Sequence, residues 1–249
     1  MTWDKAIIWS KVGLVSISIA SVVIFGSYGS MNSQNAAPLD QLRTRSMNSQ
    51  NAAPLDQLRT RLYSTDQDTS ALALGELIRL GKQATPILLE ALNHPTPRTR
   101  RLAAEGLAEI RDPASADALE RATHDSNGEV RARAAVALHI LGDPRALGAL
   151  VRTLDDYPDI LHNPYTASMY ALTTGDRAVL PLIAPLLKAP QPLTRERALL
   201  VIKAIVSRMP EGHNWNQFWQ SLGCYDPHSE PAARDRAADL WIAWIQQQH

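Results

Sequence analysis

Residues 129–154 read EVRARAAVALHILGDPRALGALVRTL, and this stretch decides the fold. Its first half carries apolar residues at the spacing of one face of an α-helix: Val130, Ala134, Ala137, Leu138 and Leu141. Its second half carries a similar stripe: Ala146, Leu147, Leu150, Val151 and Leu154. Between the stripes, Gly142 suits a left-handed helix end, and Asp143 with Pro144 suits the start of another helix. The stretch therefore predicts two amphipathic helices joined by a tight turn.

The same kind of turn recurs along the chain at intervals of 30, 31 and 33 residues, starting at Gly81, Arg111, Gly142 and Gly175. We expect a small-residue helix before each turn, at 70–80, 99–110, 130–141 and 165–172. A leucine-rich helix is expected after each turn, at 84–92, 114–122, 145–154 and 179–187, with Pro185 bending the last one. A fifth unit begins at Thr194. Because one hairpin cannot bury both of its apolar faces, the hairpins must stack, which predicts an all-α fold.

The pattern VRxxAAxALxxLGDPxAxxxL, carried by residues 130–150, resembles the HEAT-like repeats of the phycobilisome-lyase type. The similarity covers residues 70–209 and implies a right-handed α-solenoid of HEAT-like helical hairpins. In such repeats an aspartate and an arginine six residues later often form a hydrogen-bonded ladder between units. Asp125 and Arg131 match this spacing, whereas Arg100 and Arg195 follow His94 and Ala189, and the fourth unit has no arginine at this place. The resemblance therefore predicts an interrupted ladder, and the irregular sequence after residue 154 predicts an enlarged loop at 155–164.

Composition and charge argue against several classes of function. Lys and Arg together number 25, as do Asp and Glu, so the chain has no basic excess for nucleic-acid binding. The single cysteine, Cys224, excludes an internal disulfide and a cysteine-based zinc site. No H-x-x-x-H, HExxH or G-x-S-x-G motif occurs. We therefore expect no catalytic residues, no metal ligands, no cofactor and no enzymatic activity.

Residues 12–28, VGLVSISIASVVIFGSY, contain no charged side chain. Lys5 and Lys11 precede this run, and the next charged residue is Asp40. This asymmetry predicts that residues 1–29 form a single-pass signal anchor or transmembrane helix with a cytoplasmic N-terminus. The solenoid would then be periplasmic or otherwise extracytoplasmic. A cleaved signal peptide and a buried helix of a soluble protein are the alternatives.

Residues 30–61 are predicted to be a linker between this anchor and the repeats at 62–209. The linker contains an identical tandem duplication, because residues 46–61 repeat the sequence SMNSQNAAPLDQLRTR of residues 30–45 without a change. A structural repeat keeps its pattern while its sequence drifts, so full identity indicates a recent duplication. A doubled docking motif is the alternative interpretation.

Residues 210–249 hold four of the six tryptophans: Trp215, Trp219, Trp241 and Trp244. The end of a solenoid exposes an apolar face that a dissimilar terminal unit has to cover. The segment is therefore predicted to be an aromatic C-terminal helical cap. A ligand surface with exposed indole rings is the alternative.

These features together favour a membrane-tethered scaffold that binds a partner protein on the non-cytoplasmic side, as an accessory subunit of a larger membrane complex. Candidate binding residues come from the starts of the repeats, the irregular loop and the aromatic segment: Arg100, Arg131, Tyr157, Tyr165, Trp215 and Trp219. The alternative, which the resemblance implies, is an enzyme or enzyme subunit of the bilin-lyase type.

Overall fold

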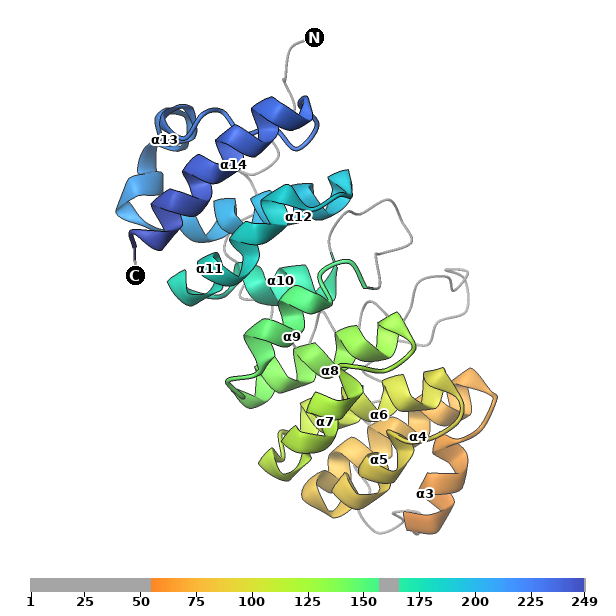
Figure 1. The fold of residues 1–249 in the computed structure, drawn as a ribbon. Helices are drawn as coiled ribbons and strands as arrows, with labels where there is room; N and C mark the ends of the chain where they lie inside the picture. Colours follow the sequence, from red (N-terminus) through yellow and green to blue (C-terminus); the bar gives the residue numbers. More distant parts are fainter. Residues whose placement is uncertain (1–54, 157–165, 249) are drawn as a thin grey trace, which may run out of the picture. The chain divides into compact units, whose positions relative to one another are not determined.

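The computed structural model describes residues 55–156 and 166–248, and every regular element in these ranges is a helix (Figure 1). The helices form stacked hairpins, so the prediction of an α-solenoid is confirmed; its hand stays a prediction. The predicted anchor at 1–29, most of the predicted linker, Tyr157 and Tyr165 lie outside the described residues. In the described ranges, no helix combines the length and apolarity that a membrane span requires.

The first half of the array contains three regular hairpins preceded by helix α3 (Leu55–Leu62). The first hairpin is α4 (Gln67–Leu80), the short 3₁₀ helix η2 (Gly81–Ala84) and α5 (Thr85–Ala91). The second is α6 (Pro97–Ile110), η3 (Pro113–Ser115) and α7 (Ala116–Ala122). The third is α8 (Gly128–Leu141) and α9 (Ala146–Arg152). These bounds lie within a few residues of the predicted ones.

The second half is less regular. Its fourth hairpin is α10 (Ala167–Thr173), η4 (Arg177–Val179), α11 (Leu180–Ile183) and η5 (Ala184–Lys188). The predicted helix at 179–187 is divided at Pro185, because proline lacks the N–H that a continuous helix needs. Helix α12 (Pro192–Val206) follows, and η6 (Pro210–Asn214), α13 (Trp215–Ser221) and α14 (Pro231–Gln246) complete the chain.

Short polar side chains set where the helices begin and turn. The first helices α4, α8 and α10 are capped by Asp66, Asn127 and Thr166, whose side chains accept a hydrogen bond from a backbone N–H of the first turn. In the turns, Asp112, Asp143 and Asp176 each accept a bond from the backbone N–H two residues later. Gly142 adopts the left-handed conformation expected of it, with φ of 72°. The recurring turn is therefore a repeated hydrogen-bonding unit.

The core lies between successive first helices, since α4, α6, α8, α10 and α12 pack in that order. Helices α5, α7 and α9 each pack against the first helix of the next hairpin. The single apolar stripe predicted for α8 is too narrow, because the helix is enclosed by neighbours on several sides. It buries eight residues: Val130, Ala132, Arg133, Ala134, Ala135, Val136, Ala137 and Leu138.

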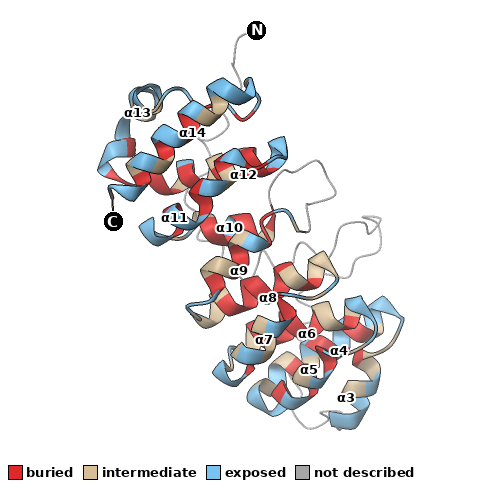
Figure 2. Cartoon of the chain, in the orientation of Figure 1, coloured by how far each residue is buried: buried red, intermediate tan, exposed pale blue. Residues whose placement is uncertain are grey.

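In the second and third hairpins the second helix is more open to solvent than the first helix, whereas α5 of the first hairpin buries four of its seven residues. Helix α7 buries only Leu119 and Ala122, and α9 buries only Ala146, Ala149 and Leu150. Figure 2 shows this contrast between the mostly buried α8 and the mixed surface of α7. The exposed side chains of the second helices are therefore available for contacts outside the chain.

Candidate functional site

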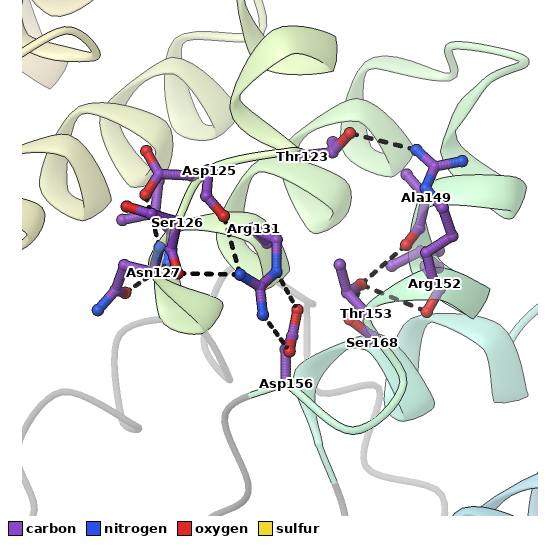
Figure 3. Close-up of polar contacts among 12 residues, drawn as sticks. Thr123, Asp125, Ser126, Asn127, Arg131, Ala149, Arg152, Thr153, Asp156 and Ser168 are labelled. Carbon is purple, nitrogen blue, oxygen red and sulfur yellow. Dashed lines mark hydrogen bonds and ion pairs between the residues drawn. The ribbon is translucent and has the colours of Figure 1, made fainter.

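Arginines near the start of two first helices connect neighbouring hairpins. In α6, Arg100 donates from Nε and Nη2 to the two carboxylate oxygens of Asp125, each at 2.7 Å. In α8, Arg131 binds Asp156 in the same way, again at 2.7 Å for both bonds (Figure 3). Each acceptor lies 25 residues after its arginine, in the loop that leads to the next hairpin. A paired bond between a planar guanidinium and a carboxylate fixes orientation as well as distance.

The remaining nitrogen of each arginine binds the backbone that precedes its own helix. Nη1 of Arg131 donates to the carbonyl oxygen of Asp125 at 2.8 Å. Nη1 of Arg100 donates to the carbonyl of His94 at 3.0 Å, and Nη1 of Arg195 donates to that of Ala189 at 2.7 Å. The missing aspartates at His94 and Ala189 therefore do not remove these bonds, because a backbone carbonyl is present whatever the side chain.

Arg195 completes this arginine ladder, which consists of Arg100, Arg131 and Arg195, in a different way. Its side chain is almost fully buried, and the acceptor of its Nε and Nη2 is not a carboxylate. Instead, Nε and Nη2 donate to the carbonyl oxygen of Pro227, at 2.9 and 2.7 Å. The loop before α14 thus supplies the acceptor that, for Arg100 and Arg131, comes from the loop leading to the next hairpin.

The ion pairs change the protonation behaviour of their members. Burial by itself raises the pKa of Asp125, but hydrogen bonds from Arg100 and from the N–H of Asn127 outweigh it and lower the pKa below its ordinary value. The bonds to Asp125 and Asp156 raise the pKa of Arg100 and of Arg131. Both predicted binding arginines therefore stay charged, and the structure directs Nε, Nη1 and Nη2 of each toward internal partners.

Four consecutive residues, Thr153–Asp156, connect three first helices, and we call this segment the joint. The Thr153 hydroxyl lies 2.7 Å from that of Ser168 in α10, and Thr166 donates to the carbonyl oxygen of Leu154 at 2.8 Å. Asp155 accepts from α12, and Asp156 accepts from Arg131 of α8. Figure 3 shows the Thr153 and Asp156 contacts side by side.

The sequence contained a signal for the pairing of Asp125 and Asp156 with ladder arginines, and the prediction missed it. The separation of 25 residues is the same for Arg100 with Asp125 and for Arg131 with Asp156. A search for charge pairs one hairpin apart would have found both. The contact of Asp155 with α12 left no such signal, because it passes over a whole hairpin.

Helices α7 and α9, with the residues that directly flank them, present a charged surface that we call the outer row: Asp117, Glu120, Arg121, His124, Arg145 and Arg152. Two ion pairs cross between the hairpins, with Arg145 at 2.9 Å from Asp117 and Arg152 at 3.6 Å from Glu120. Arg152 also donates to the hydroxyl of Thr123 at 3.2 Å (Figure 3). Exposed pairs of this kind contribute at most about 1 kcal/mol each, so an external charge can displace them at small cost.

Of the two predicted tryptophan sites, Trp215 lies in a packed cluster of aromatic rings at the end of the array, and Trp219 is held by a hydrogen bond to the backbone. The ring centroid of Trp215 lies 5.7 Å from that of Trp241, which is fully buried, and the Lys203 ammonium lies 5.2 Å from the Trp215 centroid. Nε1 of Trp219 donates to the carbonyl oxygen of Tyr225 at 3.0 Å. Both indoles are partly buried, and the role of the segment as a cap stays a prediction.

The chemistry available in the described residues is that of charge and surface shape. No three side chains of His, Cys, Asp or Glu among them come together as metal ligands would. The six predicted binding residues do not form one site there. Arg100 and Arg131 hold hairpins together, Trp215 and Trp219 pack near the C-terminus, and the two tyrosines lie outside the described ranges.

Comparison with known proteins gives one family match. The model for HEAT repeats matches residues 55–139 and 85–163, and no curated protein matches the chain. A solved complex of CpcE and CpcF of phycocyanin lyase from Nostoc sp. PCC7120 is similar at 20% identity, over 83% of this chain and 77% of that chain, with a TM-score of 0.43. A designed armadillo repeat protein in complex with the peptide (KR)4 is similar at 17% identity, over 76% of this chain and 100% of that chain, with a TM-score of 0.39. The matched HEAT residues include both regular ladder pairs.

Proposed function

The chain is a HEAT-like repeat protein, and we propose that it is a scaffold that binds a partner protein through the outer row. We further propose that residues 1–29 tether it to a membrane, with the repeats on the non-cytoplasmic side as part of a larger membrane complex. The observation that carries the binding proposal is the contrast between the enclosed first helices α6 and α8 and the open second helices α7 and α9. An array of hairpins with one solvated row of helices offers an extended surface for recognition.

The outer row fits a protein partner that carries charges of both signs. It contains the cations Arg121, Arg145 and Arg152 beside the carboxylates Asp117 and Glu120, and the cross-hairpin pairs orient Arg145 and Arg152. Complementary charges mainly set specificity and the rate of association. A nucleic acid would require an excess of cations, which the balanced composition does not supply.

The arginine ladder supports the outer row without belonging to it. The bonds from Arg100 and Arg131 fix each hairpin against the next and thereby set the spacing between α7 and α9. A rigid spacing lowers the entropic cost of binding, because the surface is already in its binding arrangement. In this proposal the two arginines position the surface and make no contact with the partner.

The membrane part of the proposal is supported by the sequence of residues 1–29. Residues 12–28 are uncharged, and lysines precede them while no lysine or arginine follows until Arg43. Such asymmetry directs the basic side to the cytoplasm. Alkaline extraction of membranes tests this part, with the full chain expected in the pellet and a chain starting at residue 30 expected in the supernatant. Extraction of the full chain into the supernatant would contradict the tether.

Site-directed photocrosslinking in native membranes tests the binding surface. A photoreactive residue placed at Arg121 or at His124, both exposed in the outer row, is expected to capture the same protein. Lys82, exposed in the turn between α4 and α5, serves as the control position and should not capture it. Arg152→Glu should weaken the capture from both outer-row positions.

Two outcomes would overturn the scaffold proposal. The first is that neither outer-row position captures a specific protein, or that Lys82 captures it equally well. The second is that the purified full chain turns over a small molecule or carries a coloured covalent bilin, which would favour the bilin-lyase alternative. Mass spectrometry of the captured and purified species distinguishes these outcomes.

A further inference from the structure

The joint lies where the regular array gives way to the irregular one. Helix α10 has seven residues, whereas α8 has fourteen and α12 has fifteen. Its fourth residue is Tyr170, at the place where α6, α8 and α12 carry Arg100, Arg131 and Arg195. No ladder arginine therefore connects the fourth hairpin to the fifth unit.

The two carboxylates of the joint bind in opposite directions. Asp156 binds Arg131, which belongs to the same hairpin as the residues that lead into the joint. Asp155 accepts from the Thr194 hydroxyl at 2.5 Å and from Nη1 of Arg197 at 2.6 Å. These two partners in α12 lie 39 and 42 residues after Asp155, so the contact passes over the fourth hairpin.

The contact between Asp155 and α12 combines a buried cation with an accessible carboxylate. The side chain of Arg197 is 2% exposed, whereas that of Asp155 is 46% exposed. A buried guanidinium that loses a carboxylate partner is strongly destabilised, so the bond holds α12 in place. The exposure of Asp155 means that solvent ions or a bound molecule can reach the bond from outside.

We propose that the joint is a coupling device, in which Asp155 makes the array from α3 to α9 and the array from α10 to α14 behave as one cooperative body. While Asp155 binds Thr194 and Arg197, the two arrays unfold together. When the bond is lost, the second array opens independently of the first. Asp156 has no such role, because its partner lies within the first array.

The tryptophans provide a natural test. Trp215, Trp219, Trp241 and Trp244 all lie in α13 and α14, so their fluorescence reports on the second array. Circular dichroism at 222 nm reports on all helices. With Trp3 and Trp9 replaced by phenylalanine in the full chain, thermal unfolding followed by both signals compares the second array with the whole.

The expected result distinguishes two neighbouring substitutions. In the background chain the two midpoints coincide. In Asp155→Ala the fluorescence midpoint falls at least about 5 °C below the circular dichroism midpoint, a shift that a change of about one hydrogen bond produces in a domain of this size. In Asp156→Ala both midpoints fall together.

A milder variant keeps the test decisive if Asp155→Ala does not fold. Thr194→Val removes one of the two bonds to Asp155 while preserving side-chain shape, and it should separate the midpoints by a smaller amount. The proposal is overturned if the midpoints coincide in every variant that alters Asp155 or Thr194. It is equally overturned if Asp156→Ala separates them as much as Asp155→Ala does.

Discussion

Glu105 of α6 and Arg133 of α8 form a nearly buried ion pair between adjacent first helices, with Oε1 and Nε 3.2 Å apart. Their side chains are only 9% and 5% exposed. Arg101 also donates to Glu105 at 2.7 Å and lies 2.9 Å from Glu129, so two cations and two carboxylates form one network. The network therefore links α6 to α8 by charge as well as by apolar packing.

Removal of one member of this network should be costly. Glu105→Gln removes the carboxylate charge that lies 3.2 Å from the buried Arg133, and we expect a loss of about 3–5 kcal/mol in the free energy of unfolding. Glu129→Gln, at the more exposed edge of the network, should cost less than half of that. Urea denaturation of both variants measures the difference. Equal effects of the two substitutions would contradict a special role for the buried pair.

The ladder should make stability depend on pH through Asp125. The pKa of Asp125 is lowered in the folded chain, so its contribution is fully present above the unfolded value of 3.8 and is lost as the pH falls through the folded value. Asp125→Asn should therefore be less stable than the original chain at pH 7. The difference should shrink steadily below about pH 4. Denaturation curves at several pH values measure it, and a difference that does not change with pH would contradict the assignment.

The sequence predicted the hairpins well because periodicity and turn chemistry are local. The glycine and aspartate of each turn and the apolar stripes lie within one hairpin, so their spacing is visible directly. The backbone acceptors of Arg100 and Arg195, the carbonyls of His94 and Ala189, were missed because a backbone carbonyl leaves no mark in the sequence. The contact of Asp155 with Arg197 joins residues 42 apart in the chain and passes over a whole hairpin, so no local pattern in the sequence indicates it.

The charge of Glu109, at the end of α6, should lower the stability of the folded chain at neutral pH. Burial raises its pKa, which the charge of Glu105 raises further and that of Arg111 partly offsets, and its Oε1 is buried with no hydrogen-bond partner among the described residues. A raised pKa means that this group favours the folded state only at low pH, and that its effect is lost as the pH rises through the folded value.

Glu109→Gln should therefore raise the melting temperature at pH 7 and have little effect below the unfolded value of 4.5. Glu90→Gln, which removes an exposed partner of Arg59, should not stabilise the chain. Calorimetry at pH 7 and pH 4 checks both variants. A stabilisation by Glu109→Gln that persists at low pH would indicate a cause other than the charge.

The duplicated segment offers a matched pair of substitutions. Leu58 of the second copy is fully buried in α3, and Leu42 occupies the same place in the first copy, outside the described residues. Leu58→Ala should lower the free energy of unfolding by about 2–5 kcal/mol, as expected for a buried leucine, and Leu42→Ala should leave it unchanged. The double variant should match Leu58→Ala. A much larger effect in the double variant would mean that the first copy replaces the second in the array.

Two glycines should respond to alanine in opposite ways. At Gly212 in η6, an added Cβ would lie 1.9 Å from the carbonyl oxygen of Val206 and 2.5 Å from its carbon, and this backbone cannot move without displacing the end of α12. At Gly75 in α4, an added Cβ meets nothing within 4 Å. Gly75→Ala should stabilise the chain by about 0.5–1 kcal/mol, since alanine loses less conformational entropy in a helix. Gly212→Ala should destabilise the chain by several times that amount, because the added Cβ would clash with backbone atoms of Val206 and Ser207. Urea denaturation of both variants measures the two effects.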